Sequence, residues 1–208
     1  METPPPRTRR ATRDDLPALA AVLARAFAND PYFSWLAGTD TERNQRMRDA
    51  WLGILRFASA GLRETWTDEN RTGAAIWIPP GRQPSSWLDS LRLLPTFARL
   101  TGWGRLREAS AAVEFLEERR RQHAPEPHYY LSALGVEPER QGEGIGTALL
   151  EPVLRAADET VAAAYLETAT ARNVLLYERA GFAVVEELVL PRTDIHGWLM
   201  LRRPGARP

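Results

Sequence analysis

The stretch VEPERQGEGIGTALLEPVL, Val136 to Leu154, joins a glycine-rich segment to an apolar one. Its glycines at 142, 144 and 146 relax the limits on the backbone, and an apolar run at helical spacing follows at once. A flexible loop that leads into a helix N-terminus presents unpaired N–H groups and a partial positive charge, so it suits an anion such as phosphate. The stretch therefore predicts a strand, an anion-binding loop and a helix of about 145–159.

The loop has four interpretations. A P-loop needs Lys before Ser or Thr, and it is excluded because all 27 basic residues of the chain are Arg. A dinucleotide fingerprint needs a third glycine where Thr147 stands and an acidic residue near Ala162. The pyrophosphate loop of acetyl-coenzyme A enzymes, Gln/Arg-x-x-Gly-x-Gly/Ala, matches at Gln141, Gly144 and Gly146. A glycine-rich turn that only joins a strand to a helix is the fourth, and the loop by itself leaves the last two open.

Composition narrows the class of protein. With 208 residues the chain is long enough to bury a core in one domain. The formal net charge is +0, so no basic field is present to recruit nucleic acid. The absence of Cys excludes disulfides and thiolate metal sites, and we expect no metal. Since no apolar run approaches the ~20 residues of a membrane span and no signal-peptide pattern is present, we expect a cytoplasmic protein without a membrane partner.

Hydrophobic periodicity and turn residues predict the first half. We expect a disordered tail at 1–6, a loose tail at 204–208 and a single domain over 7–203. In chain order the domain begins with a short edge strand at 7–12, a helix at 13–28 with a capping box at Thr12 and Asp15, a helix at 41–60, and a hairpin of RETWTDE and GAAIWIPPG. A helical insertion covers about 82–127, with breaks at Pro95 and Gly102–Gly104. The basic run Arg119–Arg121 is interpreted as its solvated end.

The second half alternates strands and helices. HYYLSALGV predicts a strand with a bulge at Gly135, and AAYLETAT predicts another after the loop and its helix. RNVLLYERAG predicts a helix that Gly181 ends, and FAVVEELVL and GWLMLRR predict two final strands. This order is typical of an α/β fold with a mixed sheet.

Three motifs carry a resemblance to a known family. In this order and spacing, LGVEPERQGEGIGTALLEPVL, YLETAT and RNVLLYERAGF resemble the core of the GNAT acetyltransferase superfamily over about residues 128–185. AFANDPYFSWL near the N-terminus is similar to the puromycin N-acetyltransferase-like branch. The resemblance implies an α/β, GNAT-like fold with a mixed, mostly antiparallel central sheet flanked by helices, and a helical insertion before the cofactor-binding strand. It also implies transfer of an acetyl group from acetyl-CoA, as co-substrate, to a primary amine.

The resemblance assigns acetyl-CoA to particular residues. The pantetheine arm would pair with the backbone of Leu134, Gly135 and Val136. Backbone N–H groups of the loop would hold the pyrophosphate, since oriented dipoles can replace a basic patch. The loop residues are Gln141, Gly142, Glu143, Gly144, Ile145, Gly146 and Thr147. Arg140 could add a charge contact or be a solvated surface residue, and Asn173 could contact the cofactor or cap its helix.

Two residues are candidates for acid–base catalysis. In the superfamily a Tyr in LYE..GF protonates the departing coenzyme A thiolate, which implies that Tyr177 is a general acid; the alternative is a Tyr packed between helix and sheet. Glu167 lies in YLET, where several relatives place a catalytic Glu, and could take the amine proton or be solvent-facing or salt-bridged. His128 and His196 are further candidates for the base, and a chain of waters could replace it.

Aromatic residues outside the matched core suit an apolar or aromatic acceptor, with core packing as the alternative. They are Tyr32, Trp35, Trp51, Trp66, Trp87 and Trp103. Asp30, Glu64 and Asp68 could attract a cationic amine, and the insertion could form a lid. We therefore expect an N-acetyltransferase for a small-molecule amine, monomeric or homodimeric. The alternatives are a protein or peptide N-acetyltransferase and a non-catalytic acyl-CoA sensor.

Overall fold

The computed structural model describes residues 6–58, 64–81 and 87–206, and gives side chains between residues 87 and 101 only from residue 94 onward. Residues 1–5 of the predicted N-terminal tail and residues 207–208 of the predicted C-terminal tail lie outside the described residues.

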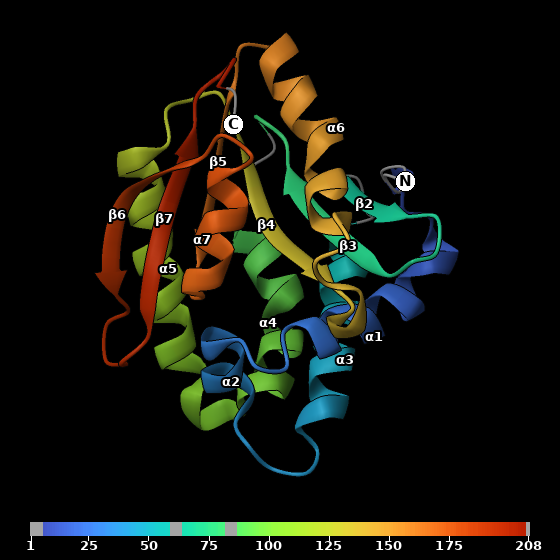
Figure 1. Ribbon diagram of the computed structural model, residues 1–208. Coiled ribbons are helices and arrows are strands. Elements are labelled where there is room, and N and C mark those ends of the chain that lie inside the picture. Colours follow the sequence, from blue (N-terminus) through green and yellow to red (C-terminus); the bar gives the residue numbers. More distant parts are fainter. Residues whose placement is uncertain (1–5, 59–63, 82–86, 207–208) are drawn as a thin grey trace.

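A seven-stranded sheet forms the centre of the molecule, in the order β1-β2-β3-β4-β5-β7-β6. The strands are β1 (Thr8–Arg10), β2 (Glu64–Asp68), β3 (Gly73–Ile78), β4 (His128–Val136), β5 (Ala163–Thr168), β6 (Ala183–Val189) and β7 (His196–Arg202). All neighbouring strands are antiparallel except β4 and β5, which are parallel (Figure 1). The mixed, mostly antiparallel sheet, the edge strand β1 and the hairpin of β2 and β3 confirm the prediction.

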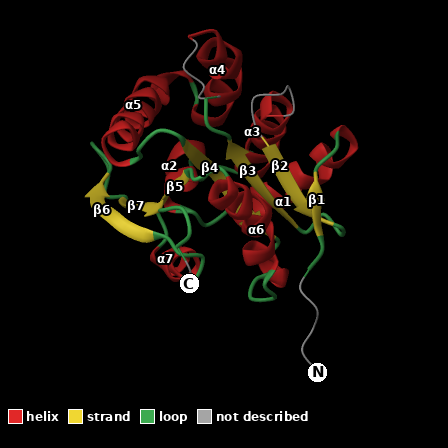
Figure 2. Ribbon diagram, turned by 90° about the horizontal axis from the view of Figure 1, so that it is seen from above, coloured by secondary structure: helices red, strands yellow, loops and turns green. Residues whose placement is uncertain are grey.

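Helices cover both faces of the sheet (Figure 2). They are α1 (Leu16–Ala26), α2 (Pro31–Ala37), α3 (Arg43–Phe57), α4 (Trp87–Thr101), α5 (Leu106–His123), α6 (Ile145–Glu159) and α7 (Ala171–Glu178). In the view of Figure 2, α3, α4 and α5 lie on one side of the strands, and α6 and α7 lie on the other. The helices α4 and α5 form the predicted insertion, since they stand between β3 and β4 in the chain.

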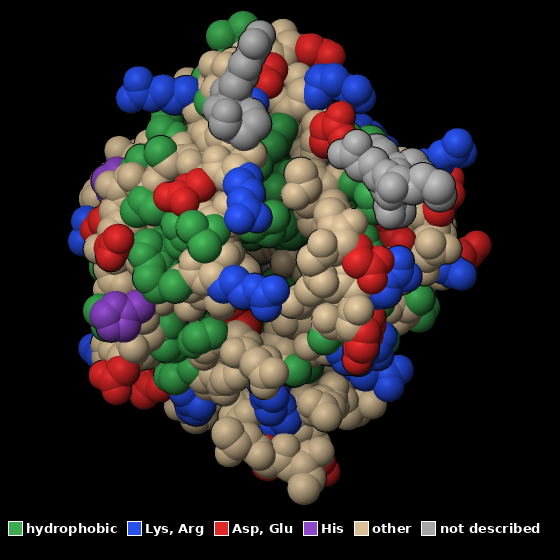
Figure 3. Space-filling model, in the orientation of Figure 1, with side chains coloured by type: hydrophobic (Ala, Val, Ile, Leu, Met, Phe, Trp, Pro, Cys, Tyr) green, Lys and Arg blue, Asp and Glu red, His purple; other side chains and the backbone are tan. Residues whose placement is uncertain are grey.

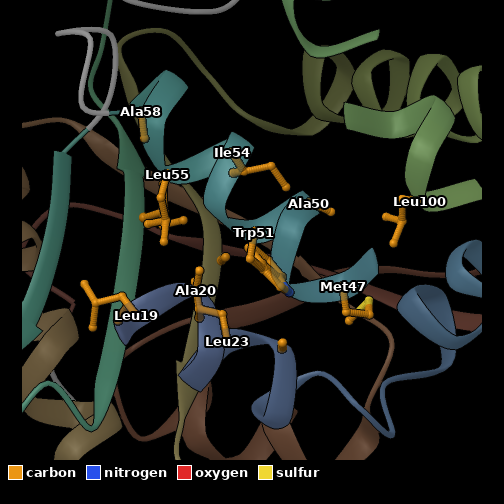
Figure 4. Close-up of a cluster of buried hydrophobic side chains, with 14 of the residues drawn as sticks. Leu19, Ala20, Leu23, Met47, Ala50, Trp51, Ile54, Leu55, Ala58 and Leu100 are labelled. Atoms are coloured by element: carbon orange, nitrogen blue, oxygen red, sulfur yellow. The ribbon is translucent and has the colours of Figure 1, made fainter. Parts of the chain in front are cut away.

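The interior strand β3 is buried on both faces because its side chains alternate between two cores. Ala74 and Ile76 pack in a cluster with Leu23 of α1 and Trp51 of α3, part of which Figure 4 shows. Ala75 and Trp77 pack in the other cluster, with residues of α6 such as Leu149. Fully burying one such large apolar side chain contributes roughly 1.5–3 kcal/mol, so both helical layers are held mainly by apolar burial.

The predicted capping box is present before α1. The backbone N–H and the hydroxyl of Thr12 both donate to Asp15 Oδ2, at 2.7 and 2.9 Å. The helix predicted at 13–28 begins as a 3₁₀ turn, Arg13–Asp15, and continues as α1. Arg9 of the edge strand adds a two-pronged ion pair to Asp15, with distances of 2.7 and 2.9 Å. The start of α1 is therefore fixed to the sheet as well as capped.

Pro95 does not break the helix, contrary to the prediction: α4 runs through it to Thr101. Close packing against α3 accounts for the difference. A Cβ on Gly53 of α3 would stand only 2.7 Å from Thr96 Oγ1 of α4, so the two helices approach closely beside the proline. Tertiary contacts outweigh the hydrogen bond that one Pro removes. The predicted break at Gly102 is correct, since Gly102 adopts φ 72° after the helix end.

The bulge of β4 lies at Ser132 and not at the predicted Gly135. Ile76 pairs with Ala133 while its neighbour Trp77 pairs with Leu131, so Ser132 is the extra residue of β4. The side-chain alternation reverses across it, because Leu131 packs toward α6 and Ala133 toward α1. Gly135 pairs regularly with Ala74.

Candidate active site

The strands β4 and β5 separate in the middle of the sheet. Their parallel ladder joins His128–Leu131 to Ala163–Leu166 and ends there. Beyond that point β4 continues only along β3, and β5 only along β7. The bulge at Ser132 lies where the ladder stops. The sheet therefore opens between the last residues of β4 and the end of β5.

A cavity of about 160 Å³ lies at this opening. In Figure 3 the molecular surface is hollowed near its centre, between the positions of α6 and α7, with hydrophobic side chains inside. Four of the residues predicted for catalysis or cofactor binding line the cavity: Leu134, Glu167, Asn173 and Tyr177. The structure thus brings together residues of β4, β5 and α7.

Tyr177 lies on one wall of the cavity. Its side chain is buried, and its ring meets that of Phe182 edge-on at 5.9 Å between centroids. A C-terminal Schellman motif fixes this end of α7: Phe182 N–H bonds Tyr177 C=O at 3.0 Å, and Gly181 adopts φ 87° as predicted. Burial, and secondarily the charge of Asp30, raise the pKa of Tyr177 above its usual value. The phenol is therefore protonated at neutral pH and available as a proton donor.

Glu167 lies half-buried on β5 and lines the same cavity. Its Oε2 accepts a hydrogen bond of 2.7 Å from the hydroxyl of Tyr130. Burial raises the pKa of Glu167 to about 7, and the bond from Tyr130 and the charge of Arg120 oppose that rise. A carboxylate that exchanges its proton near neutrality suits a general base.

Asn173 also reaches the cavity, from the first turn of α7. Its Nδ2 lies 3.4 Å from Thr168 Oγ1, a long hydrogen bond. The N-cap position of α7 belongs to Thr170 and carries no side-chain cap bond. Asn173 therefore does not cap its helix, and its amide faces the site through a weakly held side chain.

The glycine loop has the geometry of an anion site. Gly142 and Gly144 adopt φ 89° and 79°, in the left-handed region that favours glycine. The helix α6 begins directly after them and has no acidic residue in its first turn. The first helical hydrogen bond runs from Ala148 N–H to Gly144 C=O, so Ile145, Gly146 and Thr147 are the first-turn residues whose N–H groups precede it. Gln141 closes the preceding turn, because its Nε2 donates to Val136 C=O at 3.2 Å.

The loop lies beside the cavity and not in its lining. A Cβ on Gly146 would stand 3.7 Å from Leu176 of α7 and 3.9 Å from both Leu134 and Val136 of β4. The start of α6 is therefore wedged between the end of β4 and α7. The first turn of α6 is thus adjacent to the part of β4 that β5 does not pair with.

The charged residues of the loop pair with one another. Arg140 Nη2 lies 2.7 Å from Glu143 Oε2, so the guanidinium that could have contacted an anion is already paired, and Glu143 has its charge compensated. Glu137, at the start of the loop, is paired with Arg25 of α1 at 2.5 Å. These pairs reduce the negative potential around the loop without supplying a free basic patch.

Gly135 has a packing role. A Cβ on Gly135 would stand 2.7 Å from Leu23 Cδ2 and 3.0 Å from the Cβ of Ala26. The helix α1 can therefore lie close against β4 only because residue 135 has no side chain. This contact holds α1 over the strand that ends at the loop.

The remaining walls of the cavity come from several elements. Asp30 lines the cavity at the N-terminus of α2, where its Oδ1 accepts a bond from Phe33 N–H at 3.0 Å. Burial raises the pKa of Asp30, and bonds from Phe33, Tyr32 and Thr170 oppose the rise. Tyr32 and Phe33 line the cavity beside it. Trp35 stacks on Tyr32 with ring centroids 6.0 Å apart, one layer farther out.

Among the lining residues that the sequence did not single out are two large aromatic side chains, Tyr130 and Trp198. A signal for Tyr130 was present: it lies in the strand HYYLSALGV, whose parallel partner would place it beside Tyr165, two residues before Glu167. For Trp198 the chain offers no comparable signal, since its place depends on the pairing of β7 with β5.

Several residues that the sequence suggested for acceptor binding do not line the cavity. Glu64 pairs with Arg10 at 3.0 Å, and the carboxylate of Asp68 accepts bonds from the N–H groups of Thr72 and Gly73 in the β2–β3 turn. Three aromatic residues do not contribute to the cavity: Trp51 is a core residue, Trp66 lies under the guanidinium of Arg10, and Trp103 is 77% exposed. The side chain of Trp87 lies outside the described residues.

The histidines are also poor candidates for the base. His128 is buried at the opposite end of β4 from the loop and lies 3.3 Å from Glu126. His196 is exposed at the start of β7 and does not line the cavity. Glu167 is therefore the better-placed base.

Within residues 6–58, 64–81 and 87–206 no group of three or more His, Cys, Asp and Glu side chains could hold a metal ion. No helix in the same described part of the chain is long and apolar enough to cross a membrane.

Comparison with known proteins gives consistent matches. Residues 74–182 match the family model described as Acetyltransferase (GNAT) family. An uncharacterised N-acetyltransferase of Schizosaccharomyces pombe is 25% identical over 204 residues, covering 94% of this chain and 83% of the yeast protein. A crystal structure described as histone acetyltransferase HPA2 and related acetyltransferase from Corynebacterium glutamicum has a TM-score of 0.70 at 23% identity, covering 97% of each chain. The C-terminal condensation domain of Ebony in complex with beta-alanyl-dopamine has a TM-score of 0.68 at 12% identity, covering 95% of this chain and 98% of that one.

Proposed function

Because the chain belongs to the acetyltransferase (GNAT) family, we propose that it moves an acetyl group from acetyl-CoA to the primary amine of a small molecule. The observation that carries the proposal is the cavity between β4 and β5, where Tyr177 and Glu167 face the same space. One residue is held protonated by burial and the other exchanges its proton near neutrality. A pair of groups with such separated pKa values suits acid–base catalysis.

The chain offers a matching place for acetyl-CoA. The opening beyond Leu131 exposes the edge of β4 at Leu134 and Val136, along which the pantetheine arm would lie. The first turn of α6, at Ile145, Gly146 and Thr147, would bind the pyrophosphate through its N–H groups. Left-handed glycines before it and the absence of acidic side chains in it fit an anion. Asn173 would contact the arm near the thioester.

The proposed chemistry uses two residues of the cavity. Glu167 accepts a proton from the ammonium form of the acceptor, since only the free amine has a lone pair to attack a thioester. The nitrogen then forms a bond to the acetyl carbon, and the bond from that carbon to sulfur breaks. Tyr177 donates its proton to the departing thiolate, and the acylated nitrogen then loses its second proton to the Tyr177 phenolate, which restores the acid. Buried walls around both groups limit competing hydrolysis by water.

The cavity favours a compact amine. Its volume of about 160 Å³ is close to that of cavities of roughly 150 Å³ that hold benzene, so one ring or a short chain fits. The aromatic side chains of Tyr32, Phe33 and Trp198 supply apolar walls. Two carboxylates, Asp30 and Glu167, line it, and among the described residues no Arg or His does. These features favour an amine that arrives as a cation.

We further propose that the chain is a member of the puromycin N-acetyltransferase-like branch. Its acceptor would then be an antibiotic-like or other specialised metabolite. We also infer that residues 7–203 act as one acetyltransferase domain, in which the insertion 82–127 contributes Leu116 to the cavity. The fold itself is compatible with either acceptor class. Of the two similar structures, one is described as a histone acetyltransferase and related acetyltransferase, and the other holds beta-alanyl-dopamine.

A two-step experiment tests the function. Calorimetry with acetyl-CoA first measures binding, and a panel of aromatic amines, aliphatic polyamines, aminoglycosides and N-terminal peptides is then assayed by thiol release. We expect binding and turnover of at least one small aromatic or short-chain amine. Peptides that react orders of magnitude faster than every small amine would establish a protein acetyltransferase instead. Binding of acetyl-CoA without transfer to any acceptor and without hydrolysis would support the acyl-CoA sensor.

A further inference from the structure

The helix α5 reaches Glu167 through an unusual buried residue. Arg120 was expected at a solvated helix end, yet it is only 6% exposed. It continues the buried face of α5 that Ala109, Ala112 and Leu116 begin. Its neighbour Arg121 is exposed, with 61% of its side chain accessible. A guanidinium is rarely buried to this degree without a partner that compensates the loss of water.

One partner of Arg120 is an aromatic ring next to the proposed base. The Arg120 Cζ lies 4.6 Å from the centroid of the Tyr130 ring, within the range of a cation–π contact. Arg120 also forms an ion pair with Glu117 of the same helix, at 3.6 Å. The hydroxyl of Tyr130 in turn donates to Glu167 Oε2 at 2.7 Å. A continuous chain of contacts therefore runs from α5 through β4 to the carboxylate on β5.

We propose that Arg120 and Tyr130 are positioning residues for Glu167: they hold its carboxylate in one orientation and keep it ionised while the acceptor amine approaches. This inference rests on the proposed role of Glu167 as the base. Tyr130 fixes one oxygen of the carboxylate through its hydrogen bond of 2.7 Å. A cation on the face of the Tyr130 ring makes its hydroxyl a stronger donor. The hydrogen bond therefore favours the negative charge of the Glu167 carboxylate.

The groups around Glu167 determine in which direction its pKa moves. From α5, Arg120 lowers the pKa of Glu167 and Glu117 raises it; from β4 and β5, Tyr130 and Tyr165 lower it. Tyr32 of α2 is close enough to sense the charge of Glu167. On β7 the residue in register is the apolar Leu199. Arg120 and Tyr130 thus counter the burial that favours the neutral carboxyl group.

The test is the pH dependence of kcat in Tyr130→Phe, which removes the hydroxyl and keeps the ring. The pKa of Glu167 should rise, so the acidic limb of the profile should move about 1–2 pH units upward, the size expected for one hydrogen bond to a charged group. At pH 7 kcat should fall about 5- to 50-fold and recover at higher pH. Arg120→Gln should move the limb in the same direction, and Arg120→Lys should move it less. The KM for acetyl-CoA should not change.

The matched control is Arg121→Gln, which removes the same charge from the adjacent exposed position and should leave the profile unchanged. Thermal denaturation of each variant identifies any that fail to fold. A ¹³C NMR titration of the Glu167 carboxyl, assigned by its loss in Glu167→Gln, measures the same shift without turnover. An unshifted titration in folded Tyr130→Phe, or a kcat that falls equally at every pH, would overturn the inference. If Glu167→Gln itself retains full turnover, the proposed base is wrong while the NMR result still stands.

Discussion

Gly135 of β4 and Leu23 of α1 lie so close together that a Cβ on Gly135 would stand 2.7 Å from Leu23 Cδ2. The contact seals the helix against the strand whose end leads into the glycine loop. A side chain added at residue 135 should therefore disturb the packing of α1 on β4.

Gly135→Ala should destabilise the protein by about 1–3 kcal/mol, because Leu23, Ala26 and Phe27 surround the added methyl group in a filled core. Urea denaturation measures the loss. Gly104→Ala is the control, since a Cβ there meets nothing within 4 Å. Equal stability of the two variants would contradict the close packing of α1.

Gly146→Val should abolish binding of acetyl-CoA while the protein stays folded. Position 146 does not need a left-handed backbone, and its Cβ would meet neighbours only at 3.7 Å and beyond. The branched side chain would stand over the first turn of α6, where the pyrophosphate is proposed to bind. Calorimetry should show the loss, and Gly104→Val should bind normally. Undiminished binding by folded Gly146→Val would remove the site.

Tyr177→Phe should lower kcat roughly 10²–10⁴-fold, the usual contribution of a general acid, because the ring remains and the proton is lost. The affinity for acetyl-CoA and the melting temperature should change little, since the ring still packs on Phe182. Steady-state kinetics with the best small amine measures the effect. Turnover equal to that of the unmodified protein would make Tyr177 a packing residue.

Glu167→Gln should remove the acidic limb of the pH–rate profile. In the unmodified protein kcat should fall as the pH drops through about 7, the pKa of Glu167, because the carboxylate becomes protonated and no longer accepts the amine proton. In the variant a lower, flatter rate should remain over the same range. A limb that persists unchanged in Glu167→Gln would assign the titration to another group.

Asp158→Asn should destabilise the protein by about 1–2 kcal/mol at pH 7. Arg202 is buried and pairs with Asp158 through bonds of 2.7 and 2.8 Å, so the variant leaves a buried cation without its partner. About a third of the Asp158 side chain is exposed, and screening by solvent reduces the effect below that of a fully buried pair. Urea denaturation of the two proteins at pH 7 measures the difference.

The same pair has a predicted pH dependence. Arg202 lowers the pKa of Asp158 in the folded protein. The stabilisation is therefore complete above the ordinary pKa of Asp, ~3.9, and is lost as the pH falls through the lower folded value. The stability difference between the unmodified protein and Asp158→Asn should shrink below pH 4. The exposed pair of Glu118 with Arg121 is the control, and Glu118→Gln should change stability little at either pH.

The amino-acid sequence by itself determined the elements whose cause is local. The helix predicted at about 145–159 has those bounds, because glycines precede it and apolar residues then recur at helical spacing. Gly181 ends α7 as predicted, since a left-handed residue is needed there. The order of strands and helices was enough for the mixed sheet, because a parallel pair needs a helical crossover between its strands.

Tertiary structure alone decided the environment of the site. The bulge fell at Ser132, where β4 leaves β5, because strand pairing and not glycine content fixes its position. Glu167 accepts a hydrogen bond from Tyr130, which lies 37 residues away in the sequence. Arg120 is buried although it lies in a basic run. Hydropathy and backbone preference belong to single residues and their sequence neighbours. Burial and proton affinity depend on which elements pack together, and here β4, β5 and α5 meet only in the folded chain.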